Sequence, residues 1–241
     1  MQNTNSNNMK VIILCGGKGQ RISSETVKKP KPLIKIGKIP IIEHILKIFL
    51  KNNFNNFYLL VGYKGYKFKK YFEKKKKYNV KIINTGLNTG TAARLKFIKK
   101  FLKKNENFMM TYGDGVTNQN LEKLKSFHIK KKRICTMTIV RPPARFGEVT
   151  IKNDFVSNFK EKRQVSSGWI NGGYMVLNQK IFKYISNKKS EMLEQKPLEK
   201  ISKLKNISAF KHLGFWQCMD TLREKEYLDE LCKKGKSPWL D

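Results

Sequence analysis

Acidic residues are scarce in this chain of 241 residues, which holds 18 Asp and Glu against 51 Lys and Arg and so carries a formal net charge of +33. Long apolar runs are also missing, because the best candidate, around Ile39–Leu50, is interrupted by Glu43, His44 and Lys47. A helix that spans a bilayer needs about 20 predominantly apolar residues. The composition therefore excludes a membrane-inserted protein and directs attention to anionic ligands.

Cysteine is sparse, and no secretory signal is recognisable. The four cysteines are far apart and form no C-x-x-C pair, which argues against a zinc site. The first eight residues, M-Q-N-T-N-S-N-N, lack the basic and apolar regions of a secretory signal. We expect residues 1–8 to form a disordered extension, residues 9–241 to form a single domain, and the protein to work in the cytoplasm with reduced thiols.

The excess of positive charge raises the hypothesis of a nucleic-acid-binding protein, since Lys and Arg neutralise phosphates. Arginine, the usual residue for reading base edges, is found only seven times. The lysines are spread over several predicted helix faces and do not gather on one element with interleaved aromatic residues. Solvated helix faces explain this distribution more simply. We keep specific nucleic-acid binding as an alternative of a different functional class.

Apolar strands and amphipathic helices alternate along the chain, which predicts an α/β domain. The pattern then changes to a hairpin, over Phe146–Ile151 and Phe155–Lys160, with a turn at Asn153–Asp154. The predicted fold is a Rossmann-like, mostly parallel mixed sheet flanked by helices, with a small antiparallel insertion for a second ligand. The expected strands before the insertion are 10–14, 57–61, 80–83, 107–112 and 134–140, and those after it are 170–177 and 207–211. The expected helices are 40–51, 66–76, 91–104, 121–130, 179–185, 193–204 and 221–233.

The strongest functional signal is a glycine-rich turn that follows the first apolar strand. Val11–Leu14 lead directly into Gly16, Gly17 and Gly19, and cations follow as far as Lys31. Glycine allows a charged ligand to approach the backbone, and successive N–H groups can form an anion site. The segment matches neither the Walker pattern nor the dinucleotide pattern G-x-G-x-x-G. It therefore indicates a phosphate-binding turn of another type, with an ordinary strand-to-loop turn as the alternative.

Two carboxylates are candidate magnesium ligands. Asp114 ends an apolar strand in Y-G-D-G-V, at the edge where ligands bind open α/β sheets. Asp220 precedes Thr221 and Glu224, which have the spacing of a capping box. Magnesium prefers oxygen ligands and takes one or two protein carboxylates. A turn aspartate is an equally good interpretation of Asp114 alone, and a simple helix start is the better interpretation of Asp220 alone.

A second group of polar residues lies after the insertion. Lys162 follows Glu161 in a loop, where it could hold a phosphate monoester, and Asn171 with Gly172 could bind sugar hydroxyls. Taken alone, these residues are explained better by solvated loop polarity.

Taken together, these segments resemble the sugar-1-phosphate nucleotidyltransferases, most closely the glucose-1-phosphate cytidylyltransferases. The resemblance covers nearly everything from Met9 to Leu240. The motifs that carry it are L-C-G-G-K-G-Q-R-I (14–22), K-P-K-P-L (29–33), I-G-K-I-P-I-I-E-H-I (36–45), V-G-Y-K-G-Y (61–66), T-Y-G-D-G-V (111–116), R-F-G-E-V (145–149), F-K-E-K (159–162), W-I-N-G-G-Y-M-V-L (169–177), G-F-W-Q-C-M-D-T-L-R-E-K-E-Y-L (214–228) and K-G-K-S-P-W (234–239).

The resemblance implies an enzyme that transfers a cytidylyl group from CTP to α-D-glucose 1-phosphate, giving CDP-glucose and pyrophosphate for deoxysugar and surface polysaccharide (O-antigen) biosynthesis. It implies Mg²⁺ on Asp114 and Asp220, catalysis by Arg21, Lys31 and Asp114, and a homo-oligomer. It also assigns sugar-phosphate binding to Glu161, Lys162, Asn171 and Gly172. The nucleotide-binding residues that it implies are Leu14, Gly16, Gly17, Gly19, Gln20, Arg21, Lys31, Thr89, Arg94 and Gly113.

The chain departs from the family pattern at a few positions. Gln20 stands where threonine is usual, and Arg163 stands where the usual motif ends in proline. The T-G-G-R segment near the base is T-G-T-A-A-R here (89–94), and the region between Lys70 and Gly90 is shorter than usual. A different base (UTP or dTTP) or another sugar phosphate therefore stays open, and so does a catalytically silent nucleotide-binding module.

Overall fold

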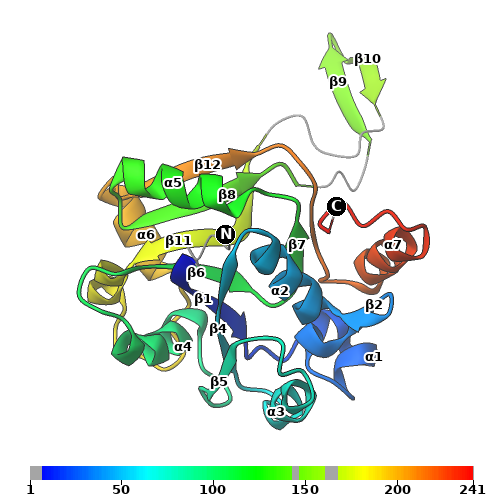
Figure 1. Cartoon of the computed structure of the whole chain (residues 1–241). Helices are drawn as coiled ribbons and strands as arrows, with labels where there is room; N and C mark the ends of the chain where they lie inside the picture. The colour runs from blue at the N-terminus through cyan, green and yellow to red at the C-terminus, as the bar shows by residue number, and fades with distance from the viewer. Residues whose placement is uncertain (1–6, 143–146, 161–167, 241) are drawn as a thin grey trace, which may run out of the picture.

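The structure is a computed structural model that describes residues 7–142, 147–160 and 168–240. Its centre is a seven-stranded sheet with the strand order β12-β8-β11-β6-β1-β4-β5 (Figure 1). β11 runs antiparallel to both of its neighbours, and the other neighbouring strands pair in parallel. This arrangement confirms the predicted mostly parallel mixed sheet. The strands are β1 (Asn7–Cys15), β4 (Phe54–Val61), β5 (Val80–Asn84), β6 (Asn107–Tyr112), β8 (Cys135–Val140), β11 (Ile170–Asn178) and β12 (Ile207–His212).

The sheet is buried on both faces because its central strands are apolar at successive positions. In β1, Val11 and Ile13 belong to the core on one face, and Ile12 and Leu14 belong to the core on the other. The first core also contains residues of α2 (Ile41–Lys51), α3 (Tyr66–Glu73), α5 (Leu121–Lys131) and α7 (Leu222–Lys233). The second contains residues of α4 (Thr91–Leu95) and α6 (Lys196–Lys203). α1 (Ser23–Thr26) is a single turn after the glycines.

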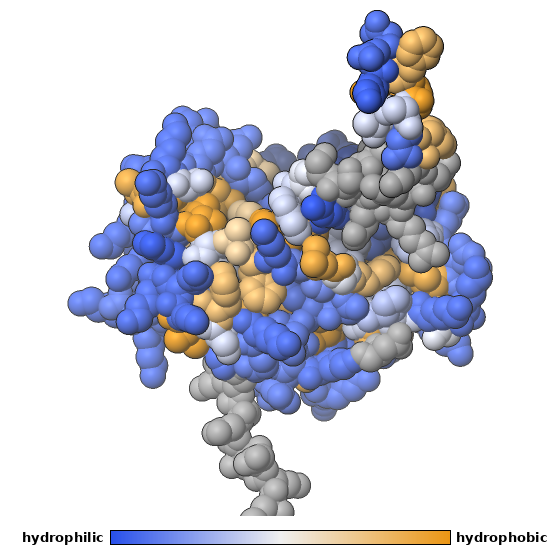
Figure 2. All heavy atoms as spheres, turned by 90° about the horizontal axis from the view of Figure 1, so that it is seen from above, coloured by the Kyte–Doolittle hydropathy of each residue, from blue (hydrophilic) through white to orange (hydrophobic). Residues whose placement is uncertain are grey.

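Three small antiparallel pairs accompany the main sheet: β2 (Lys35–Ile36) with β3 (Ile39–Pro40), β7 (Gly115–Thr117) with β13 (Trp216–Cys218), and β9 (Glu148–Lys152) with β10 (Phe155–Lys160). The last pair is the predicted hairpin. Its turn residues Asn153 and Asp154 both have positive φ, which confirms the turn. The hairpin projects from the body of the protein (Figure 1), and its apolar side chains stand out among hydrophilic residues in Figure 2.

Several elements differ from the sequence prediction at their ends. β1 begins at Asn7, inside the expected 1–8 extension, whose residues 1–6 lie outside the described part of the chain. The helix expected over 91–104 ends at Leu95 and continues as a 3-10 helix over Lys96–Phe101, and the helix expected over 179–185 is also a 3-10 helix. The helix expected from Leu193 begins only at Lys196, as α6, because Leu193 and Glu194 form hydrogen bonds with Thr91 at the start of α4.

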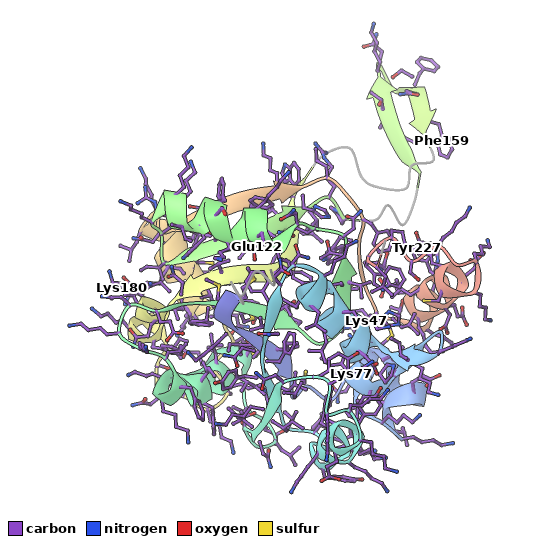
Figure 3. All side chains as sticks on the ribbon, in the orientation of Figure 1. Lys47, Lys77, Glu122, Phe159, Lys180 and Tyr227 are labelled. Carbon is purple, nitrogen blue, oxygen red and sulfur yellow. The ribbon has the colours of Figure 1, made fainter. Side chains whose placement is uncertain are left out.

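The lysines lie apart on the surface, as the sequence indicated. In Figure 3, Lys180 extends on the opposite side of the molecule from Lys47 and Lys77, and hydrophilic residues cover most of the face shown in Figure 2. None of the described helices is both long and apolar enough to cross a bilayer.

Candidate active site

Lys31 contacts both of the carboxylates that the sequence analysis identifies as candidate metal ligands. Its ammonium Nζ donates to Asp114 Oδ2 at 2.7 Å and also to Asp220 Oδ1. Arg21 Nη1 lies 2.9 Å from the other oxygen of Asp220. Arg21, Lys31, Asp114 and Asp220 therefore form one cluster, although 189 sequence positions separate Lys31 from Asp220.

Local structure holds Lys31 in this position. Pro30 and Pro32 flank it, and residues Lys31–Leu33 form a 3-10 turn in which Leu33 N donates to Pro30 O at 2.8 Å. Proline suits the first turn of a helix because its φ is fixed there. Only 8% of Lys31 is exposed. Burial lowers the pKa of the Lys31 ammonium, but Asp114 and Asp220 raise it by more, so the net pKa lies above its ordinary value and Lys31 is a fixed cation.

Asp220 owes its position to the start of α7. Thr221 is the N-cap residue, and its side chain and that of Glu224 form the predicted capping box. Glu224 Oε2 also accepts from Asp220 N at 2.7 Å. Because these groups satisfy the first backbone donors of the helix, the Asp220 carboxylate is not needed as a cap and is available to the cluster.

Arg94 lies under the glycine turn. Its guanidinium donates from Nη1 to Val61 O at 3.1 Å and to Thr85 Oγ1, and from Nη2 to Thr89 O at 2.9 Å and Gly16 O at 3.4 Å. A Cβ on Gly16 would lie 1.8 Å from Arg94 Nη1. The close approach of Arg94 therefore requires glycine at position 16. Arg94 also supports the backbone of the glycine-rich segment that the sequence analysis predicts to bind phosphate.

The remaining predicted nucleotide residues lie around this turn. Gly113 N donates to Leu14 O at 3.1 Å, and a Cβ on Gly113 would lie 2.7 Å from Pro32, which brings the end of β6 against the Lys31 turn. Gly19 has a φ of +66°, and Gln20 follows it at the start of a 3-10 turn (Gln20–Ile22). The Thr89 hydroxyl donates to Thr85 O at 2.8 Å, so its side chain is engaged in its own loop.

The predicted sugar-binding residues are only partly described. Asn171 Oδ1 accepts from Gly173 N at 2.8 Å, and Gly172 O accepts from Trp216 Nε1 at 2.7 Å. These contacts fix the start of β11 next to the β7–β13 pair. Glu161 and Lys162 lie outside the described residues.

The sequence interpretation missed a set of contacts from the β4–α3 loop and the first turn of α3. Three side chains of this region donate to three successive backbone carbonyls between Arg21 and Lys31, and so hold the segment that connects the two cations. The pairs are Tyr63 Oη with Thr26 O at 3.4 Å, Lys64 Nζ with Val27 O, and Lys67 Nζ with Lys28 O at 2.6 Å. The motif V-G-Y-K-G-Y was noticed for its resemblance, but nothing local in the sequence indicates these partners.

A further missed residue is Glu194, in the segment before α6. Its carboxylate accepts hydrogen bonds from Tyr112 Oη and from Thr91 Oγ1, the latter at 2.6 Å. Tyr112 ends β6, two residues before Asp114. Residue spacing could not have indicated this contact, because Glu194 is 82 positions from Tyr112.

The two carboxylates are the groups of this cluster that could hold a divalent cation. Asp114 and Asp220 each place a carboxylate oxygen against the Lys31 ammonium, with 29% and 19% of their side chains exposed. No group of three or more His, Cys, Asp or Glu side chains in the described residues could hold a metal ion. A pair of carboxylates suits Mg²⁺, which keeps several waters, better than it suits zinc, which takes four protein ligands in structural sites.

Known proteins with similar sequences include nucleotidyltransferases that act on glucose 1-phosphate. The chain is 38% identical to a glucose-1-phosphate cytidylyltransferase of Salmonella typhimurium, over 96% of this chain and 98% of that protein. It is 36% identical to a probable glucose-1-phosphate cytidylyltransferase of Bacillus subtilis, over 96% of this chain and 99% of that protein.

Solved structures share the fold. A UDP-glucose pyrophosphorylase in complex with UDP-glucose superposes with a TM-score of 0.73 at 14% identity, over 95% of this chain and 99% of that one. HddC from Yersinia pseudotuberculosis with GMP-PN superposes with a TM-score of 0.70 at 21% identity, over 92% and 98%. The nucleotidyl transferase family matches residues 10–222, which include the glycine turn, Lys31, Asp114 and Asp220. On this evidence, the chain belongs to the nucleotidyl transferase family.

Proposed function

We propose that this protein transfers a cytidylyl group from CTP to α-D-glucose 1-phosphate, forming CDP-glucose and releasing pyrophosphate. The observation that carries the proposal is the contact of the Lys31 ammonium with both Asp114 and Asp220, next to the glycine turn. The base and the sugar are taken from the relatives, two of which are named as cytidylyltransferases acting on glucose 1-phosphate.

In the proposed reaction, an oxygen of the sugar phosphate attacks the α-phosphorus of CTP in line. The new P–O bond forms as the bond to the bridging oxygen breaks, and pyrophosphate leaves with the electron pair of that bond. Catalysis of this kind depends on positioning and on charge neutralisation. The backbone of Gly16, Gly17 and Gly19 cradles the nucleotide, and Arg21 with Lys31 offsets the charge on the phosphates.

Asp114 and Asp220 would hold Mg²⁺, which supplies Lewis-acid neutralisation of phosphate oxygens when bound. Arg21 contacts Asp220 and Lys31 contacts Asp114, so both cationic side chains lie beside the proposed metal site. Because Lys31 is buried and held by two carboxylates, it keeps its position without substrate. Such preorganisation lowers the cost of stabilising charge in the transition state.

For the sugar half, we propose that Lys162 and Glu161 bind the phosphate end and that Asn171 and Gly172 bind the sugar. We further propose one domain over residues 9–241, a homo-oligomeric assembly in the cytoplasm, and a role in making deoxysugars of surface polysaccharide. The contacts that hold the start of β11 against the β7–β13 pair support the position of Asn171.

A nucleotide panel tests the proposal. The protein is incubated with glucose 1-phosphate, magnesium and each of CTP, UTP, dTTP, ATP and GTP, and pyrophosphate release is followed. We expect the largest kcat/KM with CTP. Stronger release with UTP or dTTP would refute the base assignment, and no release with any nucleotide would point to a silent binding module. Tight duplex binding that persists at physiological salt would instead favour the nucleic-acid alternative, which the relatives do not support.

A further inference from the structure

Glu194 brings together three segments that are far apart in the sequence. Its Oε1 accepts from Tyr112 at the end of β6, and its Oε2 accepts from Thr91 at the start of α4. Leu193 N donates back to Thr91 Oγ1 at 2.7 Å, so the backbone beside Glu194 is also fixed. The carboxylate is therefore held at a defined place, although its residue is exposed.

No Lys or Arg of the described residues forms an ion pair with Glu194, even though the chain has 51 basic residues. In contrast, Asp114 and Asp220 each contact a cation. An ionised carboxylate offers about four lone-pair sites, and Tyr112 and Thr91 use two of those on Glu194. The carboxylate can therefore accept further hydrogen bonds from neutral donors.

These unused sites lie beside the proposed sugar residues. A Cβ on Gly173 would lie 2.9 Å from the Tyr112 ring, and Asn171 Oδ1 accepts from Gly173 N at 2.8 Å. Glu194 and Tyr112 therefore lie beside the start of β11, which carries Asn171, and Tyr112 is two residues from Asp114.

We infer that Glu194 is a specificity-determining residue, which accepts hydrogen bonds from hydroxyl groups of a neutral hexose 1-phosphate and repels sugar phosphates that carry a second acid. The inference rests on the proposed function and deepens it. A carboxylate without a cation favours ligand groups that donate hydrogen bonds, and a pyranose offers several such hydroxyls. It disfavours an anionic carboxylate or phosphate at the same place.

The test compares Glu194→Gln and Glu194→Ala with the matched variant Glu191→Gln. Glu191 belongs to the same segment, but its carboxylate accepts from Ser186 N at 2.7 Å and contacts neither Tyr112 nor Thr91. Each protein is assayed with CTP and with glucose 1-phosphate, its monodeoxy analogues and glucuronic acid 1-phosphate. Melting temperatures show whether each variant is folded.

We expect Glu194→Gln to raise the KM for glucose 1-phosphate by about tenfold, with a much smaller change in the KM for CTP, because hydrogen bonds to charged groups are about twice as strong as neutral ones. One deoxy analogue should lose about 10- to 100-fold in kcat/KM with the parent protein. That loss should largely disappear in Glu194→Ala. The preference for glucose 1-phosphate over glucuronic acid 1-phosphate should shrink in both variants and persist in Glu191→Gln.

Three results would overturn the inference. The first is an unchanged sugar preference in folded, active Glu194 variants. The second is the same deoxy-analogue loss in the parent protein and in Glu194→Ala. The third is a rise confined to the KM for CTP, which would mean that Glu194 contacts the base. Failure of the proposed function is distinguishable, because the parent protein would then form no pyrophosphate with any sugar phosphate.

Discussion

Replacement of Gly16 by alanine should destabilise the protein through Arg94. The added Cβ would lie 1.8 Å from Arg94 Nη1 and 2.0 Å from Cζ, so the guanidinium must move. Arg94 is only 3% exposed, and its four acceptors are all neutral oxygens. The φ of Gly16 is not in the left-handed region, so steric conflict with Arg94 is the main penalty.

The size of the effect follows from the hydrogen bonds at risk. A bond from a charged donor contributes about 1.5–3 kcal/mol. Movement of the guanidinium would weaken at least two of the four bonds, so we expect Gly16→Ala to lower the free energy of unfolding by about 3–5 kcal/mol. The KM for CTP should also rise, because the Gly16 carbonyl is one of the acceptors of Arg94.

A double-mutant cycle isolates this mechanism. Urea unfolding is measured for the parent protein, Gly16→Ala, Arg94→Ala and the double variant. With Arg94 shortened, the alanine at position 16 has room, so we expect it to cost less than about 1 kcal/mol in that background. The coupling energy should therefore be at least about 2 kcal/mol.

The neighbouring glycine is a matched control. A Cβ on Gly17 would meet nothing within 4 Å, so Gly17→Ala should change the free energy of unfolding by less than about 0.5 kcal/mol. Additive effects of Gly16→Ala and Arg94→Ala, within about 0.5 kcal/mol, would refute the argument that Arg94 imposes glycine at position 16.

Three further predictions concern the cluster and the core. Asp114→Asn and Asp220→Asn should each reduce pyrophosphate release by about 1,000-fold, and unchanged turnover in both would exclude their proposed metal roles. Lys31→Met should lower kcat by at least about 100-fold. A kcat within about tenfold of the parent value would contradict the role of Lys31 as a fixed cation of the site. Burial lowers the pKa of His128 from 6.5 to about 4. The unfolded state therefore binds a proton at this residue more readily than the folded state, and the folded protein loses stability as the pH falls below about 6.5. Between pH 7 and pH 5 the free energy of unfolding from urea titrations should fall by about 2 kcal/mol more in the parent protein than in His128→Gln, and equal slopes would refute the assignment.

The site was predictable from sequence where its residues stand in local patterns. Gly16, Gly17 and Gly19 directly follow an apolar strand, and Asp114 follows another, so the carboxyl edge of a parallel sheet brings them together. Thr221 and Glu224 were recognisable as a capping box from their spacing alone.

The errors in helix boundaries have a tertiary cause. The sequence predicts a helix from Leu193, but Leu193 N donates to Thr91 Oγ1 at 2.7 Å, and the Glu194 carboxylate accepts from Thr91 and Tyr112. These contacts with distant segments hold the two residues outside the helix, which begins at Lys196. Helical periodicity reports only local preference, so it could not show this competition.

Residues that are neighbours along the chain were enough to predict the alternation of strands and helices, the glycine turn after the first strand and the two candidate carboxylates. The folded structure was needed to show that Lys31 contacts both Asp114 and Asp220, that Arg94 lies under Gly16 and that Glu194 contacts Tyr112. In the sequence, Lys31 is 83 positions from Asp114 and 189 positions from Asp220. Arg94 is 78 positions from Gly16, and Glu194 is 82 positions from Tyr112. Their contacts arise when the order of the strands in the sheet brings separate loops to one edge, and residue spacing carries no record of that order.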